Sequence, residues 1–211
     1  MKVRTEARRD HILEIASQVF LESGFERASM SEIARRVGGS KATLYGYFTS
    51  KEALFLAFIR AQGQLHLTVA ETDLALYAAS DLGRVLTNFG IALISFTCST
   101  TGLAVLRTVI AEAGQSDIGR LFYETGPKQG LRKMAEALRI AMDHEVLRQV
   151  DPMIAAQHLF GLFNSEIQER WFDRDALPLS EEETKSIAER AVDVFLRAYG
   201  ADGLDFRPGN N

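Results

Sequence analysis

The residues able to do acid–base, nucleophilic or metal chemistry are scattered along this sequence. No pair among the four histidines has metal-ligand spacing: His11, His66, His144 and His158. The segment DHEV at 143–146 lacks a second histidine four residues after His144, so it predicts a solvated helix face and we expect no metal. No phosphate loop, nucleophile elbow or carboxylate pair stands out. The sequence therefore argues against an enzyme, and we expect no cofactor.

Cys98 is the single cysteine, so it cannot form an internal disulfide. It has no basic neighbour in the sequence, and we interpret it as a small core residue rather than a redox sensor.

One short segment, Lys41 to Phe48, carries the most informative pattern of hydrogen-bonding side chains. At 100° per residue, Leu44 and Phe48 share one side of a helix. Ala42, Thr43 and Gly46 occupy the opposite side, and two tyrosines flank it about 80° from the packing direction. An isolated helix of this length is marginal in water, and Gly46 costs it about 1 kcal/mol more. We therefore expect a partner to use the exposed side.

The exposed side of this segment matches the shape of a DNA major groove. The groove is about 12 Å wide and presents base edges at its floor. Small residues such as Ala42 and Gly46 allow close approach, while the hydroxyls of Tyr45 and Tyr47 are expected to meet phosphates. The alternative, which the segment alone leaves open, is that the tyrosines simply cover the edge of a helical bundle.

The charge distribution is consistent with one localised anionic partner. The whole chain has a net charge of -4, but residues 1 to 60 hold ten Lys and Arg against seven acids. The first 60 residues therefore carry +3 and the remainder -7. A basic N-terminal part on an acidic body favours DNA as a partner, and the acidic part limits nonspecific adhesion.

Capping residues define four helices in the N-terminal part. Apolar residues at helical spacing begin the first helix, and Gly24 is expected to end it. Ser29 and Glu32 predict a capping box for the second helix, with Ile33, Ala34 and Val37 facing inward. Ser40 caps the third helix and Thr49 or Ser50 the fourth. Helices two and three, joined by a short glycine turn, predict a helix-turn-helix.

The rest of the chain reads as helical, so we expect an all-α protein. The fourth helix is expected to continue to about residue 78, with Phe58, Leu65 and Leu67 packed in the body. Apolar helical stretches follow near 81–99, 102–114, 117–124, 127–147, 151–172 and 181–199. We expect a helix-turn-helix domain at 1–50, and a ligand-binding and dimerisation domain at 51–211. The opening residues lack the apolar run of a signal peptide, and a cytoplasmic location without membrane contact is expected.

Residues 11 to 55 resemble the DNA-binding domain of TetR-family transcriptional regulators. The resemblance rests on the GF turn after helix one, IA in helix two, TLYGYF in helix three and SKEAL opening helix four. It implies base-reading or groove positions for Lys41 and Thr43. It implies phosphate contacts for Tyr45, Tyr47 and Lys51, and a phosphate-facing start of helix two at Ser29 and Ser31.

Two glycines depart from the family pattern. Gly39 replaces the usual apolar turn residue and is expected to loosen the turn. Gly46 offers no side chain where many relatives have one, which removes one possible base contact.

The body is similar to the family's more variable ligand-binding and dimerisation domain. The segment Leu106 to Pro127 resembles the AefR-like branch, although the usual FP after AEA is QS here. Aromatic residues on the apolar helices are most simply core, but a minority is expected to line a ligand cavity with polar anchors. The candidate ligand-binding residues are Phe89, Phe96, Arg107, His158, Phe163, Asn164 and Trp171.

The resemblance implies a ligand-responsive repressor that binds a pseudo-palindromic operator in double-stranded DNA as a homodimer. The dimer is expected to form through the last two long helices, with Phe195 and Tyr199 as candidate contacts. Two alternatives stay open: an activator of the same fold, and a helical small-molecule-binding protein without DNA function. The small-molecule effector is not identified by the sequence.

Overall fold

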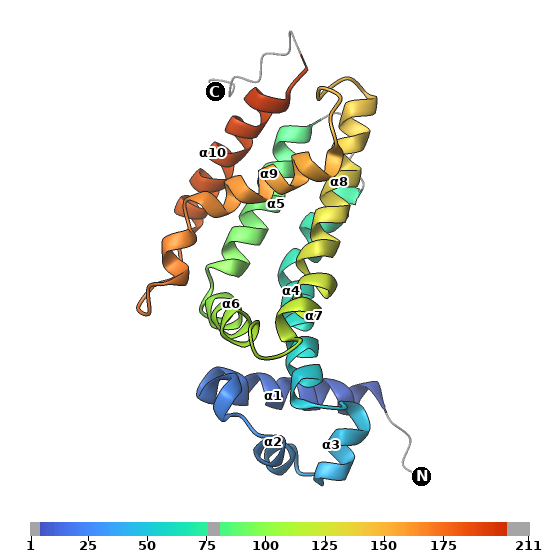
Figure 1. Cartoon of the computed structure of the whole chain (residues 1–211), viewed down its shortest axis with the longest axis vertical. Helices are drawn as coiled ribbons and strands as arrows, with labels where there is room; N and C mark the ends of the chain where they lie inside the picture. Colours follow the sequence, from blue (N-terminus) through green and yellow to red (C-terminus); the bar gives the residue numbers. More distant parts are fainter. Residues whose placement is uncertain (1–4, 76–80, 202–211) are drawn as a thin grey trace. The chain divides into compact units, whose positions relative to one another are not determined.

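The computed structural model describes residues 5–75 and 81–201, and within these ranges nearly all regular structure is helical (Figure 1). An isolated antiparallel bridge joins Leu147 and Gly200. The expected all-α class is confirmed.

Three helices form the predicted N-terminal bundle. Helix α1 spans Glu6–Arg27 and is interrupted at Gly24, whose φ of 75° lies in the left-handed region that glycine tolerates. Helix α2 spans Met30–Val37 and α3 spans Lys41–Tyr47. The hydroxyl oxygens of Ser29 and Ser40 accept the predicted capping bonds from the N–H groups of Glu32 and Thr43.

The predicted capping box of α2 forms only in part. The carboxylate of Glu32 accepts hydrogen bonds from Arg35 and Arg36, at 2.7 to 2.9 Å, instead of reaching back to the backbone at Ser29. Charged guanidinium donors bind a carboxylate more strongly than a backbone N–H does. The Ser29 side chain therefore caps α2 without the reciprocal bond from Glu32. The exposed face of α2 carries Arg35 and Arg36.

Helix α4 spans Lys51–Ala75. The Ser50 hydroxyl accepts a hydrogen bond from the N–H of Ala53, which confirms the predicted cap. The expected continuation to residue 78 lies outside the described residues. Leu65, which was expected to pack in the body, is 76% exposed, so that prediction is wrong.

Six further α-helices and one 3-10 helix follow, close to the predicted stretches. They are α5 (Leu82–Thr97), α6 (Thr100–Glu112), α7 (Ile118–Thr125), α8 (Pro127–Asp143), α9 (Pro152–Ser165), η1 (Gln168–Trp171) and α10 (Glu181–Tyr199).

The chain divides into two compact units. The first contains the residues up to Gln64 together with Ala104–Tyr123, and the second contains Leu65–Leu103 together with the residues from Glu124 onward. In the first unit, Val105, Val109 and Ile118 join the core of the N-terminal bundle. This division by packing does not coincide with the functional division at residue 50, which stays a proposal.

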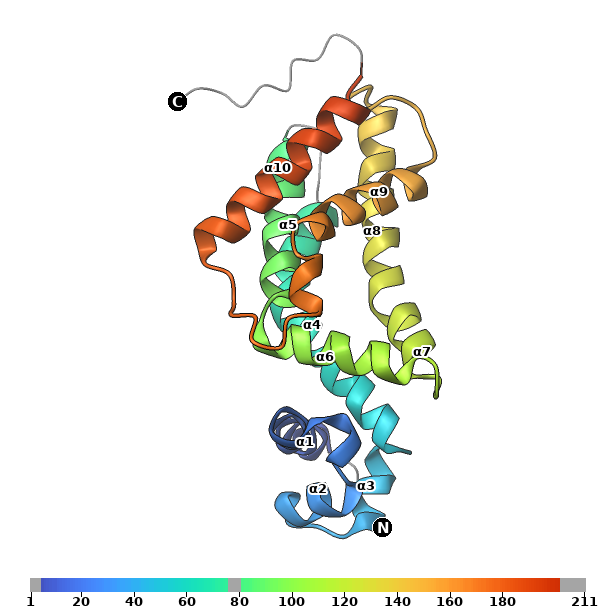
Figure 2. The same ribbon diagram turned by 60° about the vertical axis from the view of Figure 1, so that its left-hand side comes forward.

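The second unit is built around contacts of α5 with α10 and of α9 with α8 and α10 (Figure 2). Phe89, Phe163 and Phe195 are among its largest fully buried side chains. Phe195 was expected to contact a partner subunit, but it is completely enclosed by its own chain, so that prediction is wrong.

Cys98 is 1% exposed, as expected of a core residue, and burial raises the pKa of its thiol.

Among the described residues, no single helix has the length and apolar composition to cross a membrane. Helices α5 and α6 meet those criteria only as a pair, which is bent by 72°. No cluster of three or more potential metal ligands occurs in residues 5–75 and 81–201.

Candidate nucleic-acid interface

Helix α3 exposes the side that the sequence predicted. Leu44 and Phe48 are 2% and 5% exposed and belong to the core of the first unit. On the other side Lys41 and Thr43 are exposed, and Tyr45 is 48% exposed. The short helix is therefore held by two apolar anchors and leaves a polar face open to a partner.

The Ser40 cap orients the side chain of Thr43. Its Oγ1 lies 2.9 Å from Ser40 Oγ, and the same serine oxygen accepts a hydrogen bond from the Thr43 N–H at 3.1 Å. A hydroxyl group has one donor and two acceptor positions. Thr43 can thus keep its contact with Ser40 and still offer a hydrogen bond to a base edge.

The two tyrosines of α3 are held differently. Tyr47 is half-buried, and its hydroxyl oxygen accepts a hydrogen bond from the Thr5 N–H at 3.3 Å. Its O–H group is still available as a donor because that bond uses an oxygen lone pair. Tyr45 projects further into solvent. Both phenols can donate to phosphate oxygens, but Tyr47 does so from a more constrained position.

Helix α2 contributes Ser29 and Ser31, which are both exposed. Ser29 caps the helix, so its hydroxyl lies where backbone N–H groups point outward and an anion is favoured. Farther along α2, hydrogen bonds from Arg35 and Arg36 lower the pKa of Glu32 from 4.5 to about 2. Arg36 also contacts Glu22 at 2.6 Å.

Lys51 was predicted to contact phosphate, and its ammonium group also has partners inside the bundle. Its Nζ atom donates to the carbonyl oxygens of Phe25 and Glu26 at 2.9 and 3.4 Å. An ammonium group has three donors. Lys51 therefore joins the start of α4 to the end of α1, and one donor can still face outward.

The sequence prediction missed Arg8. Its Nη2 atom donates to the carbonyl oxygen of Val37, the last residue of α2, at 3.1 Å. The sequence held one signal for this contact, the glycine at position 39, which departs from the family pattern. A Cβ at that position would lie 3.3 Å from Arg8 Nη2.

The seven predicted ligand-binding residues are not brought together in one place. Phe89 and Phe163 pack on one another in the core, with ring centroids 6.5 Å apart. His158 is exposed and hydrogen-bonded to the Tyr199 hydroxyl, and Arg107 falls in the other compact unit. The Asn164 side chain donates to the Phe160 carbonyl at 2.8 Å. Trp171 is half-buried in η1, and Phe96 is half-buried at the end of α5.

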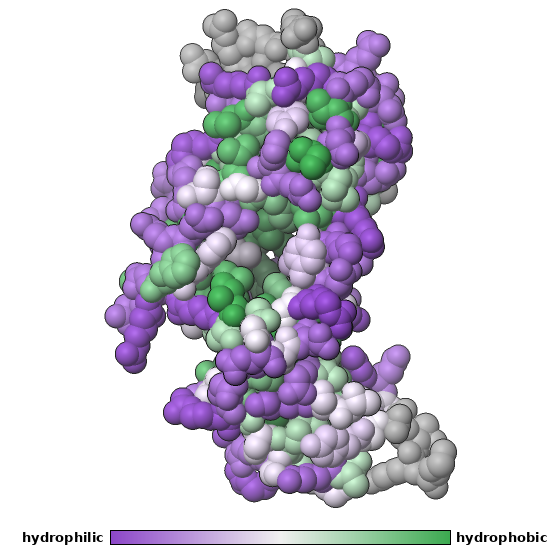
Figure 3. Space-filling view, viewed as in Figure 1, coloured by the Kyte–Doolittle hydropathy of each residue, from purple (hydrophilic) through white to green (hydrophobic). Residues whose placement is uncertain are grey.

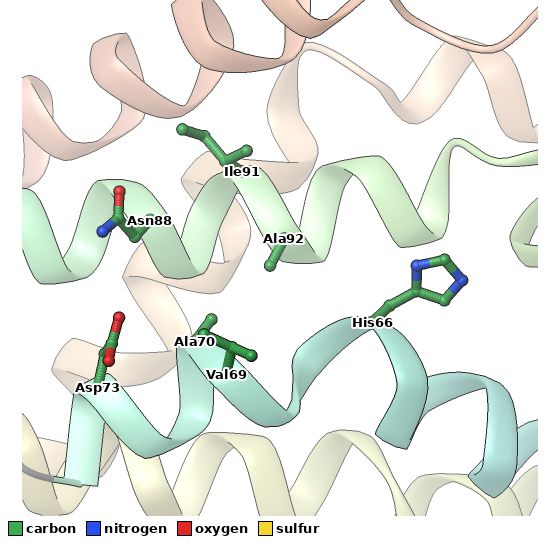
Figure 4. A pocket seen from close by; sticks show the side chains of 7 residues that line it. All are labelled: His66, Val69, Ala70, Asp73, Asn88, Ile91 and Ala92. Carbon is green, nitrogen blue, oxygen red and sulfur yellow. The ribbon is translucent and has the colours of Figure 1, made fainter.

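A groove between α4 and α5, within the second unit, offers a different candidate ligand site (Figure 4). It has a volume of about 260 Å³ and is lined by His66, Val69, Ala70, Asp73, Asn88, Ile91 and Ala92. Asp73 and Asn88 lie across from one another at one end, the small apolar residues lie in the middle, and His66 lies at the other end. The His66 ring stacks on Phe96 at 5.3 Å between centroids.

Comparison with known proteins agrees with the geometry of the N-terminal bundle. Residues 12–58 match the family model described as bacterial regulatory proteins of the tetR family. Residues 84–201, more than half of the chain, match the model described as the C-terminal domain of AefR-like transcriptional repressors. The chain belongs to the TetR family, in its AefR-like branch. It is a DNA-binding transcription regulator, as the sequence predicted.

Solved structures of TetR-family proteins match nearly the whole chain. A TetR-family regulator from Mesorhizobium loti shares 26% identity at a TM-score of 0.81, over 95% of this chain and 100% of that one. The flavonoid-responsive regulator FrrA shares 33% identity at a TM-score of 0.73, over 94% of this chain and 100% of that one.

Curated relatives match over little more than a quarter of this chain. The transcriptional activator FasR of Mycolicibacterium smegmatis is 46% identical over 55 residues, which is 26% of this chain and 25% of FasR. UidR of Escherichia coli is 42% identical over 59 residues, which is 28% of this chain and 30% of UidR. The chain thus spans about a quarter of the length of these relatives. TetR-family regulators bind operator DNA and act as dimers. FasR is named an activator, whereas the AefR-like model is described as one of repressors.

Proposed function

We propose that this protein is a ligand-responsive repressor that binds a pseudo-palindromic operator as a homodimer. The observation that carries the proposal is the exposed face of α3, a low centre flanked by Tyr45 and Tyr47 and fixed from behind by Leu44 and Phe48. Such a face fits a major groove, where base edges form the floor and phosphates the walls. Repression, rather than activation, is favoured by the description of the AefR-like branch.

Each DNA-facing residue has a proposed role. Lys41 and Thr43 read base edges from the first turn of α3. Tyr45, Tyr47 and Lys51 donate to phosphates on either side of the groove, and Ser29 and Ser31 bind phosphate at the start of α2. The support is the exposure of Lys41, Thr43 and Tyr45, together with the remaining donor capacity of the Tyr47 and Lys51 side chains.

A dimer is proposed because one bundle of this size contacts only one half-site, and two half-sites lie about one helical turn apart or a little more. The exposed apolar residues Val150, Ile154 and Val194, 37%, 46% and 50% exposed, supply candidate contacts on and beside α9 and α10. Figure 3 shows green apolar surface near the α8–α9 end of the second unit. Tyr199, buried to 9% exposure beside Phe195, is a less suitable contact.

The effector is proposed to be a small, flat aromatic molecule with a hydrogen-bond donor. In the α4–α5 groove, the Asp73 carboxylate can accept that hydrogen bond, while Ala70, Ile91 and Ala92 provide an apolar floor. The name of FrrA says that it responds to flavonoids, which are flat molecules bearing phenolic hydroxyls. The groove's volume is slightly below the usual 300–1,000 Å³ of ligand sites, which favours a small ligand. The seven residues predicted from sequence are not proposed as one ligand site, because Arg107 belongs to the other compact unit and Phe89 and Phe163 pack on one another in the core.

Binding of the effector is proposed to weaken operator binding through α4, the helix that carries Lys51 and one side of the groove, including Asp73. A coupling free energy of about 1 to 3 kcal/mol corresponds to an operator affinity about 5- to 150-fold lower. Linkage requires that operator DNA weaken effector binding by the same factor. The protein is expected to act in the cytoplasm, without enzymatic activity.

Selection from a random duplex library tests the DNA-binding part of the proposal. We expect the full chain to enrich a sequence with two related half-sites, and titration of that duplex to give two chains per duplex. Failure to enrich any sequence would favour the alternative of a small-molecule-binding protein without DNA function. Reporter transcription from a promoter that carries the enriched sequence then separates a repressor from an activator.

Titration of the complex with quercetin and a panel of simpler phenols tests the effector part. We expect one of them to release the operator duplex, and Asp73→Asn to raise the concentration required about tenfold. Thr72→Ala, on the same helix but outside the groove lining, is the matched control. Release that is unaffected by Asp73→Asn would exclude the groove while leaving the DNA-binding function intact.

A further inference from the structure

The beginning of α1 contacts the helix-turn-helix at three points. The Thr5 N–H donates to the Tyr47 hydroxyl oxygen at 3.3 Å. Arg8 donates to the carbonyl oxygen of Val37 at 3.1 Å. The guanidinium carbon of Arg9 lies 5.3 Å from the centre of the Phe48 ring. These contacts reach the end of α2 and the end of α3, so one short stretch of α1 touches both helices.

The Arg8 contact lies at the turn between α2 and α3. The last carbonyl groups of a helix lack partners within the helix. Here Gly38 adopts the left-handed conformation, with φ 68° and ψ 46°, and its N–H returns to the carbonyl oxygens of Ala34 and Arg35. The Gly39 N–H also returns to Ala34, at 3.0 Å. The half-buried guanidinium of Arg8 then binds the Val37 carbonyl, which lies just before the turn.

Gly39 provides the space that this contact requires. A Cβ atom at position 39 would lie 3.3 Å from Arg8 Nη2 and 4.0 Å from Thr43 Cβ. The backbone of Gly39 lies outside the left-handed region, so its conformation does not itself require glycine. Gly38 is the opposite case: its φ is +68° and nothing lies within 4 Å of an added Cβ. Position 38 therefore favours glycine because of its backbone conformation, whereas position 39 favours glycine because of the space that Arg8 occupies.

We propose that Arg8 is a positioning residue for sequence-specific operator binding, and that Gly39 is its steric complement. By binding the end of α2 beside the turn, Arg8 fixes the angle at which α3 leaves α2. Proposed phosphate contacts from α2 and base contacts from α3 must form at the same time, so this angle decides whether both sets of contacts reach their targets. The glycine expected from the sequence to loosen the turn instead admits the side chain that holds it.

Operator binding by five variants of the full chain tests this role. The variants are Arg8→Ala, Gly39→Ala, the double variant of these two, Gly38→Ala, and Gly38→Ala combined with Arg8→Ala. Each is measured on the duplex that the wild-type protein enriches and on an unrelated duplex. We expect Arg8→Ala to weaken operator binding about tenfold, because the Val37 carbonyl oxygen beside the turn loses its charged hydrogen-bond donor. Binding to the unrelated duplex should change less than about twofold, so the preference for the operator falls.

The salt dependence of binding separates positioning from a direct phosphate contact. A residue that neutralises a phosphate contributes about one unit to the slope of log affinity against log salt concentration. We expect the slope of Arg8→Ala to equal that of the wild-type protein. A slope lower by about one unit, with equal losses on both duplexes, would overturn the positioning role.

The double variant tests the link between Arg8 and Gly39. Gly39→Ala should weaken operator binding in the wild-type background and cost little more in Arg8→Ala, because the side chain it displaces is already gone. Gly38→Ala should have the same effect with or without Arg8, since its effect arises from the backbone. If Gly39→Ala and Arg8→Ala are additive, the proposed link is wrong. Circular dichroism checks folding, and Arg8→Met, which keeps the length of the side chain without a donor, replaces Arg8→Ala if the alanine variant does not fold.

Discussion

The Nζ atom of Lys51 lies 2.9 Å from the carbonyl oxygen of Phe25 and 4.0 Å from the centre of the Phe25 ring. The first residue of α4 thus holds the end of α1 by a charged hydrogen bond and a cation–π contact. A residue that the family resemblance assigns to DNA also has a structural role in the bundle.

Replacing this lysine should therefore lower stability as well as DNA affinity. For Lys51→Ala we expect the free energy of unfolding to fall by about 1 to 2 kcal/mol, since a charged hydrogen bond and a cation–π contact are both lost. Urea denaturation measures this change. Lys41→Ala is the matched control: Lys41 is exposed on α3, and its replacement should leave stability nearly unchanged. Equal stability of the two variants would contradict the structural role of Lys51.

The contact between Gly90 and Phe163 predicts a size limit in the core of the second unit. A Cβ at position 90 would lie 2.4 Å from Phe163 Cε1, so Gly90→Ala should destabilise the protein by about 1 to 3 kcal/mol through overpacking. Gly161→Ala is the matched control, because it lies on α9 with no atom within 4 Å of the added group. That variant should gain about 0.5 to 1 kcal/mol from helix propensity. Thermal unfolding compares both, and a stabilised Gly90→Ala would contradict the packing.

Residues 194 and 195 should separate folding from dimerisation. Phe195→Ala removes a fully buried ring and should cost about 3 to 5 kcal/mol of stability. Its neighbour Val194 is 50% exposed, so Val194→Asp should leave the fold intact but weaken the proposed dimer. Sedimentation at micromolar concentration measures the dimer. A Val194→Asp protein that dimerises like the wild type would place the interface elsewhere.

The carboxylate of Glu32 predicts a pH dependence at acid pH. Hydrogen bonds from Arg35 and Arg36 hold its folded-state pKa near 2, below the ordinary glutamate value of 4.5. A lowered pKa contributes stability that is present above about pH 4.5 and is lost as the pH falls through about 2. Glu32→Gln should therefore be less stable than the wild type at neutral pH, and the difference should shrink over that interval.

Denaturation of both proteins at a series of pH values measures this difference. A stability difference between Glu32→Gln and the wild type that is constant from pH 7 to pH 2 would argue against the role of the two arginines.

Local chemistry allowed the sequence to predict the N-terminal bundle well. Caps such as Ser29, Ser40 and Ser50 act on backbone groups two or three residues away, so the sequence contains both partners. The inward side of α3 followed from helical spacing alone. Glu32 departed from its expected capping role because two arginines on the next turn compete for the same carboxylate.

Features that depend on distant residues could not be predicted in this way. Arg8 and Val37 are 29 residues apart, and no periodic pattern connects them. An apolar helix face does not reveal whether its own chain or a partner covers it, which is why Phe195 was misassigned. Leu65 was likewise assigned to the core, although its side chain is exposed. The α4–α5 groove combines side chains of two helices, and its lining residues are individually unremarkable in the sequence.

The most direct test of the central claim is the change in operator preference caused by Thr43→Ala and Lys41→Ala. Affinities of each variant are measured at one salt concentration, for the enriched operator and for duplexes with single base-pair changes in a half-site. We predict that these variants lose affinity for the operator but little for the changed duplexes, whereas Tyr45→Phe and Tyr47→Phe lose affinity for all of them equally. Equal losses on matched and changed duplexes for both Thr43→Ala and Lys41→Ala would contradict the claim that the exposed face of α3 reads the operator.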